Sequence, residues 1–187
     1  MTGAAREGLN ITTFLSKKAK QEQAKQYKAV TLFKISKGTS QSKPPAEYAV
    51  TVRFDGGCLG NPGRKYGSYK IEDDFVVIAK ESKFQLGHGT NNEAEFEALI
   101  RALQNLREIS HRIGVNIGTT SVQVLTDSMI VRNRLTGKNT IHKKAEYRER
   151  SEVMFNLANQ CLELLRGFHS FNVEWQGRAK NVEAFGH

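Results

Sequence analysis

Carboxylate side chains stand at positions in this sequence where a metal ion could be bound. Asp55 and Asp127 each end an apolar segment, and the helical segment between them opens with Glu93, Glu95 and Glu97. Carboxylates that converge repel one another, and a divalent cation removes that repulsion. A ligand set of oxygens without Cys or His favours Mg²⁺ or Mn²⁺. The alternative is that each aspartate only caps the helix that follows it.

The surrounding pattern predicts elements that would bring these carboxylates together. Alternating or apolar segments predict strands, and 3.6-residue periodicity predicts helices. The predicted strands are 48–55, 66–73, 75–87, 121–127 and 171–176, and the predicted helices are 91–109, about 128–135 and 143–168. The order βββαβααβ predicts an α/β fold with a mixed sheet. A helical crossover allows the first and fourth strands to be parallel neighbours, which places Asp55 and Asp127 at one sheet edge.

A glycine-rich stretch, residues 56–63, follows Asp55 directly. It has two interpretations. One is an ordinary hairpin turn, in which Pro62 and Gly63 serve turn geometry alone. The other is a close approach of main chain to a ligand, which glycine permits because it has no Cβ.

Composition limits the classes of partner. The chain has 187 residues, 39% of them hydrophobic, and a formal net charge of +9. An excess of positive charge favours polyanions, with nucleic acid first and an anionic membrane second. No apolar run is long enough to span a bilayer, so no membrane association is expected. Cys58 and Cys161 match no zinc spacing and indicate free thiols, which favours a cytoplasmic protein, or a nuclear one in a eukaryote.

Three short motifs together resemble the ribonuclease HI family of the RNase H-like superfamily. They are "FDGGCLGNPG", "TNNEAEFEAL" and "VLTDS", in the family's order and spacing, and the resemblance covers about residues 48–185. It implies a five-stranded mixed sheet whose first three strands are antiparallel, flanked by helices. It also implies an endonuclease that cleaves the RNA strand of RNA–DNA hybrids with two divalent ions, Mg²⁺ or Mn²⁺, and leaves 5′-phosphate ends.

The resemblance assigns roles to particular residues. Asp55, Glu95 and Asp127 match the family's catalytic metal ligands. Six further positions match those that contact the hybrid, the first three through main chain at the RNA 2′-hydroxyls: Gly56, Gly57, Cys58, Asn61, Thr90 and Asn91. Asn92 is expected to brace the turn instead.

The C-terminus departs from the family pattern. In "RAKNVEAFGH", Arg178, Asn181 and Ala184 match, but Phe185 stands where the family has a fourth carboxylate. The second metal site should therefore be weakened. His187 is a candidate catalytic stand-in, and the alternative is an ordinary charged terminus. The departure also favours a second hypothesis, a hybrid-binding module that cuts weakly or not at all. A nuclease acting on junctions or DNA is a further alternative on the same fold.

The N-terminal part differs in composition from the rest. Residues 1–47 are expected to form a basic arm and linker, and 48–187 an RNase H-like domain. The protein is expected to be a monomer. A solvated basic tail is the default interpretation of the arm, and the alternative is that its lysines contact phosphates. Residues 8–18 also resemble a sliding-clamp-binding peptide that lacks its usual leading glutamine. Trp175 is expected in the core. Lys138, Lys143 and Lys144 are expected at a solvated surface, with contact to a phosphate backbone as the alternative.

Overall fold

The computed structural model describes residues 45–74 and 76–186. Nearly all of the predicted arm, the 8–18 peptide and His187 therefore lie outside the described residues, and the division at 47/48 stays a prediction. Among the described residues, no helix is both long enough and apolar enough to cross a membrane. Cys58 and Cys161 are both free thiols, as expected.

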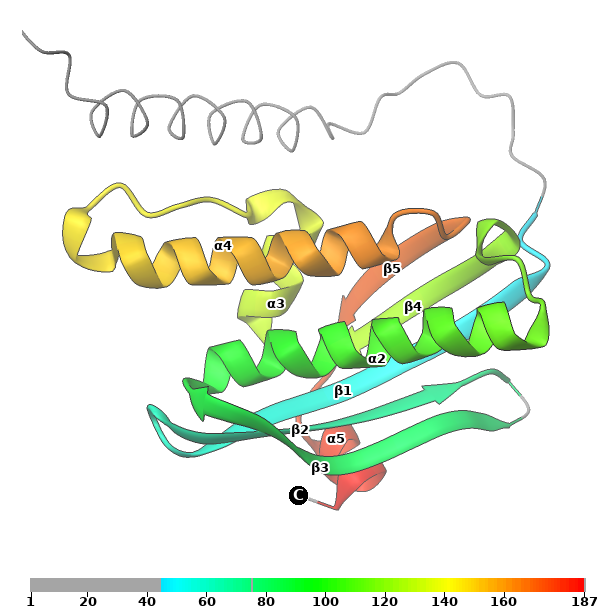
Figure 1. Ribbon diagram of the computed structural model, residues 1–187, viewed down its shortest axis with the longest axis horizontal. Helices are drawn as coiled ribbons and strands as arrows, with labels where there is room; N and C mark the ends of the chain where they lie inside the picture. The colour runs from blue at the N-terminus through cyan, green and yellow to red at the C-terminus, as the bar shows by residue number, and fades with distance from the viewer. Residues whose placement is uncertain (1–44, 75, 187) are drawn as a thin grey trace, which may run out of the picture. The chain divides into compact units, whose positions relative to one another are not determined.

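The five strands form one mixed sheet in the order β3-β2-β1-β4-β5 (Figure 1). The strands are β1 (Tyr48–Gly60), β2 (Gly63–Glu72), β3 (Val77–Gly89), β4 (Thr120–Thr126) and β5 (Ser170–Trp175). β1, β2 and β3 pair antiparallel, whereas β4 pairs parallel with both β1 and β5. The predicted fold class and the parallel pairing of the first and fourth strands are confirmed.

The helices follow the predicted order, with one more at the end. They are α2 (Asn91–Ile113), α3 (Met129–Asn133), α4 (Ala145–Leu165) and α5 (Ala179–Phe185). A short 3-10 turn, η1 (Ile117–Thr119), precedes β4, and a wide turn, η2 (Arg134–Lys138), follows α3. The strand predicted to end at Asp55 continues to Gly60, because the glycine-rich stretch pairs with β2 in unbroken register.

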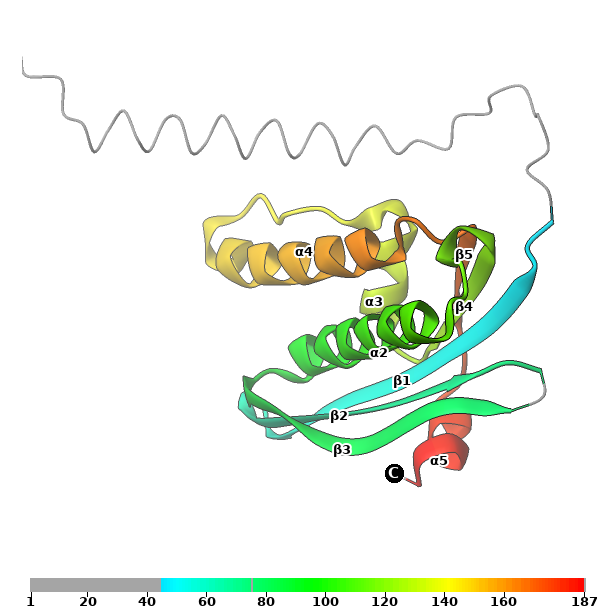
Figure 2. The same cartoon turned by 45° about the vertical axis from the view of Figure 1, so that its right-hand side comes forward.

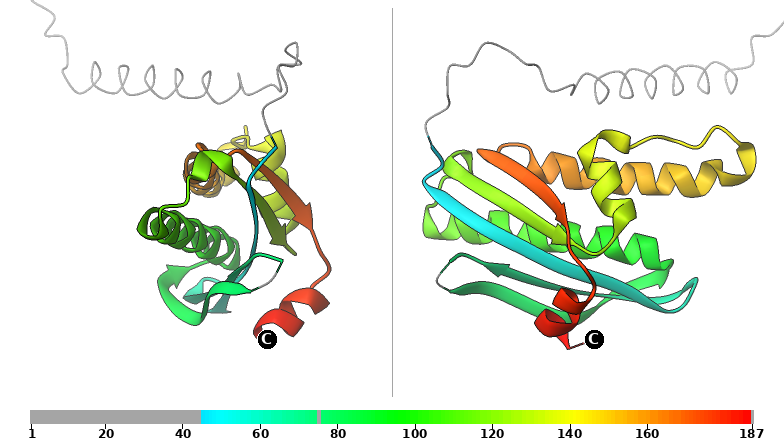
Figure 3. Two further views of the ribbon diagram at one scale, coloured as in Figure 1. Left: turned by 90° about the vertical axis from the view of Figure 1, so that its right-hand side faces the viewer. Right: turned by 180° about the vertical axis from the view of Figure 1, so that it is seen from behind.

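The sheet carries helices on both faces. α2 and α4 lie side by side over one face, as Figures 1 and 2 show, while the view from behind in Figure 3 places α5 on the opposite face. The core between the sheet and the two long helices includes fully buried Phe54, Phe96, Leu99 and Leu103. The apolar face of α2, with Ala98, Leu99 and Ala102, is buried, which fixes the rotation of this helix about its axis.

Helix α2 begins with strong local signals. The Thr90 side chain accepts a hydrogen bond from the Glu93 N–H, and the Glu93 side chain accepts one from the Thr90 N–H, which completes a capping box. The helix ends at Gly114 with φ +74°, a left-handed conformation that favours glycine. These two ends set which turn of α2 faces β1.

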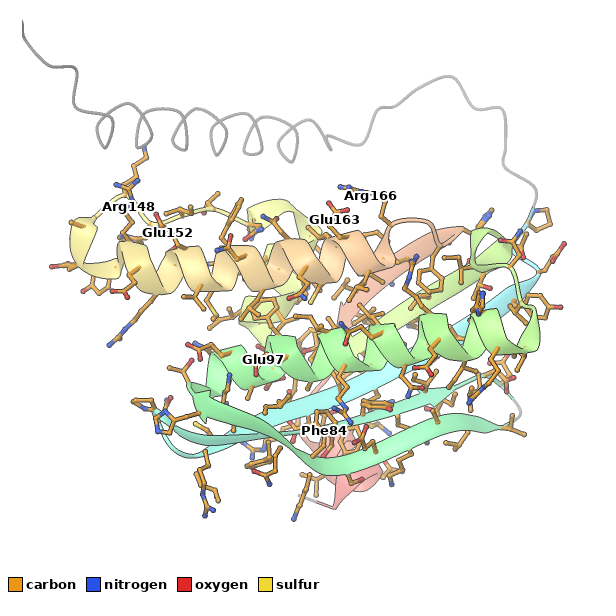
Figure 4. The ribbon with its side chains drawn as sticks, viewed as in Figure 1. Phe84, Glu97, Arg148, Glu152, Glu163 and Arg166 are labelled. Carbon is orange, nitrogen blue, oxygen red and sulfur yellow. The ribbon has the colours of Figure 1, made fainter. Side chains whose placement is uncertain are left out.

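Side-chain packing joins α2 to the edge of the sheet. The Arg101 guanidinium lies 4.7 Å from the centre of the Phe84 ring on β3 (Figure 4). A Cβ at Gly67 would collide with that ring, so a glycine on β2 makes room for Phe84 beneath the helix. The ion pairs labelled along α4 in Figure 4, Arg148–Glu152 and Arg166–Glu163, are exposed and contribute little to stability.

Candidate metal centre and nucleic-acid interface

Three carboxylates converge where β1, β4 and α2 meet. Asp55 lies on β1, Asp127 follows the last residue of the parallel strand β4, and Glu95 lies in the second turn of α2. One oxygen from each carboxylate can be chosen such that all three lie within 4.8 Å of one another. The structure thus brings together the three residues that the sequence predicted as metal ligands.

The electrostatics of Glu95 fit a cation at this place. Burial, followed by the charges of Asp55 and Asp127, raises the pKa of Glu95 well above its ordinary value, against smaller opposing effects of the Gly56 N–H and of Arg178. Glu95 is 7% exposed, and its Oε2 is buried without a hydrogen-bond partner. A buried acceptor that has no donor is costly, and a bound divalent ion would satisfy it. The donor set, carboxylate oxygens only, fits Mg²⁺ or Mn²⁺.

The start of α5 places a positive charge and a hydrogen-bonding amide near the carboxylates. Burial raises the pKa of Asp127, although its own main chain, the charge of Arg178 and a hydrogen bond with Asn181 act in the opposite direction. Asn181 is buried, and its Nδ2 donates to the main-chain oxygen of Phe54 at 3.3 Å. The matched motif residues Arg178 and Asn181 therefore lie beside the carboxylate cluster.

The rest of α5 contains the departure from the family pattern. Phe185 is half-buried in the last turn, and the Lys80 Nζ donates to the neighbouring Ala184 oxygen at 2.9 Å, which anchors the helix end to β3. Phenylalanine offers no ligand atom. Among the described residues, the cluster has no fourth carboxylate.

Close packing within the domain requires glycine at several positions after Asp55, which the sequence did not reveal. A Cβ on Gly56 would lie in hard contact with the main chain of Ala94 and Glu95, so this glycine lets β1 touch the first turns of α2. A Cβ on Gly57 would meet the Tyr66 hydroxyl. Gly63 leaves no room because of the Leu59 carbonyl, which agrees with a role in the turn. The close approach that the structure shows at Gly56 is to the helix that carries Glu95, a predicted metal ligand.

Two hydrogen bonds join the end of β1 and the β1–β2 turn to the start of α2. The Cys58 N–H donates to Asn91 Oδ1 at 3.2 Å, and the Asn91 N–H donates to Asn61 Oδ1 at 3.3 Å. Asn91 and Asn61 are both exposed. Three of the residues predicted to meet the hybrid, Cys58, Asn61 and Asn91, are thus joined at the surface, whereas Gly56 and Gly57 are buried.

The expectation that Asn92 braces the turn is wrong. Asn91 does so, whereas Asn92 is exposed and lines a surface cavity of about 400 Å³ between α2, α3, η2 and α4. Other lining residues include the cations Arg134, Lys138 and Arg150. No acidic residue lines this basic groove, and Lys138, for which phosphate contact was the alternative expectation, is one of its cations.

Trp175 is also placed differently from the expectation. It is 47% exposed, and its indole Nε1 donates to the main-chain oxygen of Asp127 at 3.0 Å. It ends β5, where Val173 is the buried residue and the positions on either side of it are exposed. Its indole holds the main chain of Asp127, a predicted metal ligand, and the alternation of β5 alone could not show this.

A mixed five-stranded sheet with this acidic cluster defines an RNase H-like protein. The sequence profile of the RNase H family matches residues 47–179, and the chain belongs to this family.

Two named relatives and one solved structure illustrate the similarity. The bifunctional protein Rv2228c of Mycobacterium tuberculosis is 32% identical over 136 residues, which cover 72% of this chain but 33% of that protein. Ribonuclease HI of Halobacterium salinarum is 29% identical over 147 residues, 78% of this chain and 65% of that protein. The chain therefore spans a third to just under two thirds of these relatives. A crystal structure of LC11-RNase H1 in complex with an RNA/DNA hybrid is 26% identical with TM-score 0.55, covering 72% of this chain and 89% of that one.

Proposed function

We propose that this protein is a metal-dependent endoribonuclease that cleaves the RNA strand of RNA–DNA hybrids. The observation that supports this most directly is the carboxylate cluster with an unsatisfied buried oxygen on Glu95. Family membership supports the nuclease class. The hybrid-bound relative LC11-RNase H1 supports the choice of substrate.

In this proposal Asp55, Glu95 and Asp127 hold the divalent ions, with Mg²⁺ or Mn²⁺ as candidates. When bound, such ions activate a scissile phosphate and lower the pKa of water. Asp55 and Asp127 keep their carboxylates at the sheet edge because their strands are parallel neighbours. Arg178 supplies a positive charge beside the cluster. The products of cleavage would carry 5′-phosphate ends.

The hybrid would lie across the surface made by the β1–β2 turn and the start of α2. Main chain at Gly56, Gly57 and Cys58 would face the RNA sugars, with Asn61, Thr90 and Asn91 along the backbones. The cations of the basic groove, Arg134, Lys138 and Arg150, lie next to Asn92 and would attract phosphates.

A second candidate function rests on Phe185. Without a carboxylate at this position, the second ion would be held weakly, and the protein could bind hybrids while cutting them slowly. His187 as a stand-in ligand would instead restore cleavage, preferably with Mn²⁺, which accepts imidazole more readily than Mg²⁺ does. Cleavage that depends on His187 would favour the enzyme over the binding module.

The decisive experiment is a cleavage assay on a labelled RNA–DNA hybrid with duplex RNA and duplex DNA as matched controls. Each substrate is incubated in Mg²⁺, in Mn²⁺ and in EDTA. Cleavage of the hybrid alone, in metal alone, is the expected result. Binding of the hybrid without cleavage would select the binding module, and cleavage of duplex DNA would select the junction- or DNA-cutting alternative.

A further inference from the structure

A buried ion cluster lies beside the N-terminal turns of α2 and shares no residue with the metal centre. Lys65, on β2, is only 4% exposed. Its Nζ lies 2.5 Å from Glu97 Oε1 and 3.7 Å from Glu93 Oε2. Figure 4 labels Glu97 on the N-terminal part of the helix. A buried ammonium group is tolerated only when paired, so Lys65 binds β2 to this part of α2.

One of these partners connects Lys65 to the helix cap. Glu93 Oε2, the oxygen that faces Lys65, also accepts the Thr90 N–H at 3.2 Å. The preceding residue, Gly89, has no space for a Cβ, because the Glu93 carboxylate and the Lys65 side chain occupy it. The Lys65 cation and the Thr90 N–H therefore hold this carboxylate, in space that Gly89 leaves open.

The segment Gly89–Asn91 is thus held from both sides. On the outer side, Asn91 bonds to Asn61 and to the main chain of Cys58. On the inner side, the Glu93 carboxylate holds Thr90, and Lys65 holds that carboxylate. Only the inner support depends on a buried charge.

The metal ligand Glu95 stands apart from this arrangement. Residues 93 and 97 are four positions apart and share one side of the helix, while residue 95 points about 200° away from each of them. Glu95 instead faces Gly56 and the aspartates. Loss of Lys65 should therefore disturb Thr90 and Asn91 more than the metal centre.

We propose that Lys65 is a positioning residue for nucleic-acid binding, which acts by holding Gly89–Asn91 in the conformation that meets the hybrid backbone. This inference rests on the proposed function for the identity of the ligand. Its physical part, the restraint on Thr90, does not depend on that identity. Lys65 itself is too buried to contact a ligand.

The test compares Lys65→Met with Lys70→Met. Lys70 is on the same strand and pairs with Glu72 at 2.5 Å, but both side chains are about a quarter exposed, so the control removes a comparable ion pair elsewhere. Lys65→Met should raise KM for the hybrid about five- to tenfold. Both kcat and the metal concentration that gives the half-maximal rate should stay within about twofold of the parent values. Amide hydrogen exchange at Thr90 should be faster in Lys65→Met than in Lys70→Met.

Two further variants keep the test valid if Lys65→Met folds poorly. Gly89→Ala displaces the Glu93 carboxylate while keeping Lys65, and should raise KM and Thr90 exchange in the same way. Lys65→Met/Glu97→Gln removes the unpaired buried charge, so it should regain stability while KM stays raised, because Glu93 still lacks its cation.

The outcomes separate this inference from the function it rests on. If the parent neither binds nor cuts hybrids, the proposed function fails, and Thr90 exchange still decides whether Lys65 restrains the segment. If the parent binds hybrids but Lys65→Met matches Lys70→Met in both KM and Thr90 exchange, the positioning role is overturned. A lower melting temperature with unchanged KM and exchange would show a purely structural ion pair.

Discussion

The two sides of the carboxylate cluster differ in how many side chains they offer to a metal ion. On the side of β1, β4 and α2, the three carboxylates are fixed by sheet register, by a glycine that admits the helix and by a capped helix start. On the side of α5, a seven-residue helix supplies Arg178 and Asn181 but has Phe185 at the position of the missing acid. The first side offers three carboxylate ligands, and the second supplies positive charge and hydrogen bonds without a further ligand. The difference predicts where substitutions should abolish activity and where they should improve it.

The largest effect should come from the complete side. Asp127→Asn keeps the shape of the side chain but removes a ligand charge, so hybrid cleavage should fall by about a thousandfold or more. Fold and hybrid affinity should change little, which circular dichroism and fluorescence anisotropy would check. Near-parental cleavage by this variant would remove Asp127 from the metal site.

The contact between β1 and α2 gives the next prediction. Gly56→Ala places a methyl group against the main chain of Ala94 and Glu95, so the helix must move and carry its metal ligand with it. We expect a loss of about 1–3 kcal/mol in the free energy of unfolding and a large fall in kcat. Gly177→Ala is the matched control, because no atom lies within 4 Å of its added Cβ. Equal kinetics for the two variants would show that the metal centre tolerates movement of α2.

The incomplete side should respond in the opposite direction. Phe185→Asp supplies the carboxylate that the family pattern has at this position, and we expect Mg²⁺-supported cleavage to rise about tenfold with a lower metal midpoint. Val182→Asp adds the same charge to an exposed position of α5 and should have no such effect. If neither variant changes the Mg²⁺ titration, residue 185 does not face the metals.

His187 provides a companion test of this side. If its imidazole serves as the stand-in ligand, His187→Ala should lose most of the cleavage rate, and parental activity should fall below about pH 6.5, where imidazole protonates. The measurement is a pH–rate profile of both proteins in Mn²⁺. Identical profiles would exclude the histidine from the site.

The sequence was sufficient for those parts of the site that depend on strand order. Asp55 and Asp127 could be placed together because a helical crossover makes their strands parallel, and Glu95 followed from the motif that starts the helix. Contacts between side chains on different elements were not accessible in this way. The ion pair of Lys65 and the exposed setting of Trp175 depend on sheet order and helix rotation, which periodicity describes only one element at a time.

The smallest expected effect is on the free energy of unfolding of the metal-free protein, in which the buried Glu95 carboxylate has no metal ion beside it. The pKa of Glu95 is raised above its ordinary value of 4.5, so the folded state holds this proton more tightly than the unfolded state does. The free energy of unfolding in EDTA should therefore be largest at low pH and should decrease as the pH rises from about 4.5 toward the raised pKa.

Glu95→Gln removes the charge, so it should flatten this decrease and raise the free energy of unfolding near neutral pH by about 1–2 kcal/mol. The variant should also lose the stabilisation that added Mn²⁺ is expected to give the parent. Glu93→Gln is an instructive comparison on the same turn, because it belongs to the cap and the Lys65 cluster and should lower stability instead. Urea unfolding across this pH range measures both, and a parent whose metal-free stability does not depend on pH in this window would show that Glu95 is better solvated than the structure implies.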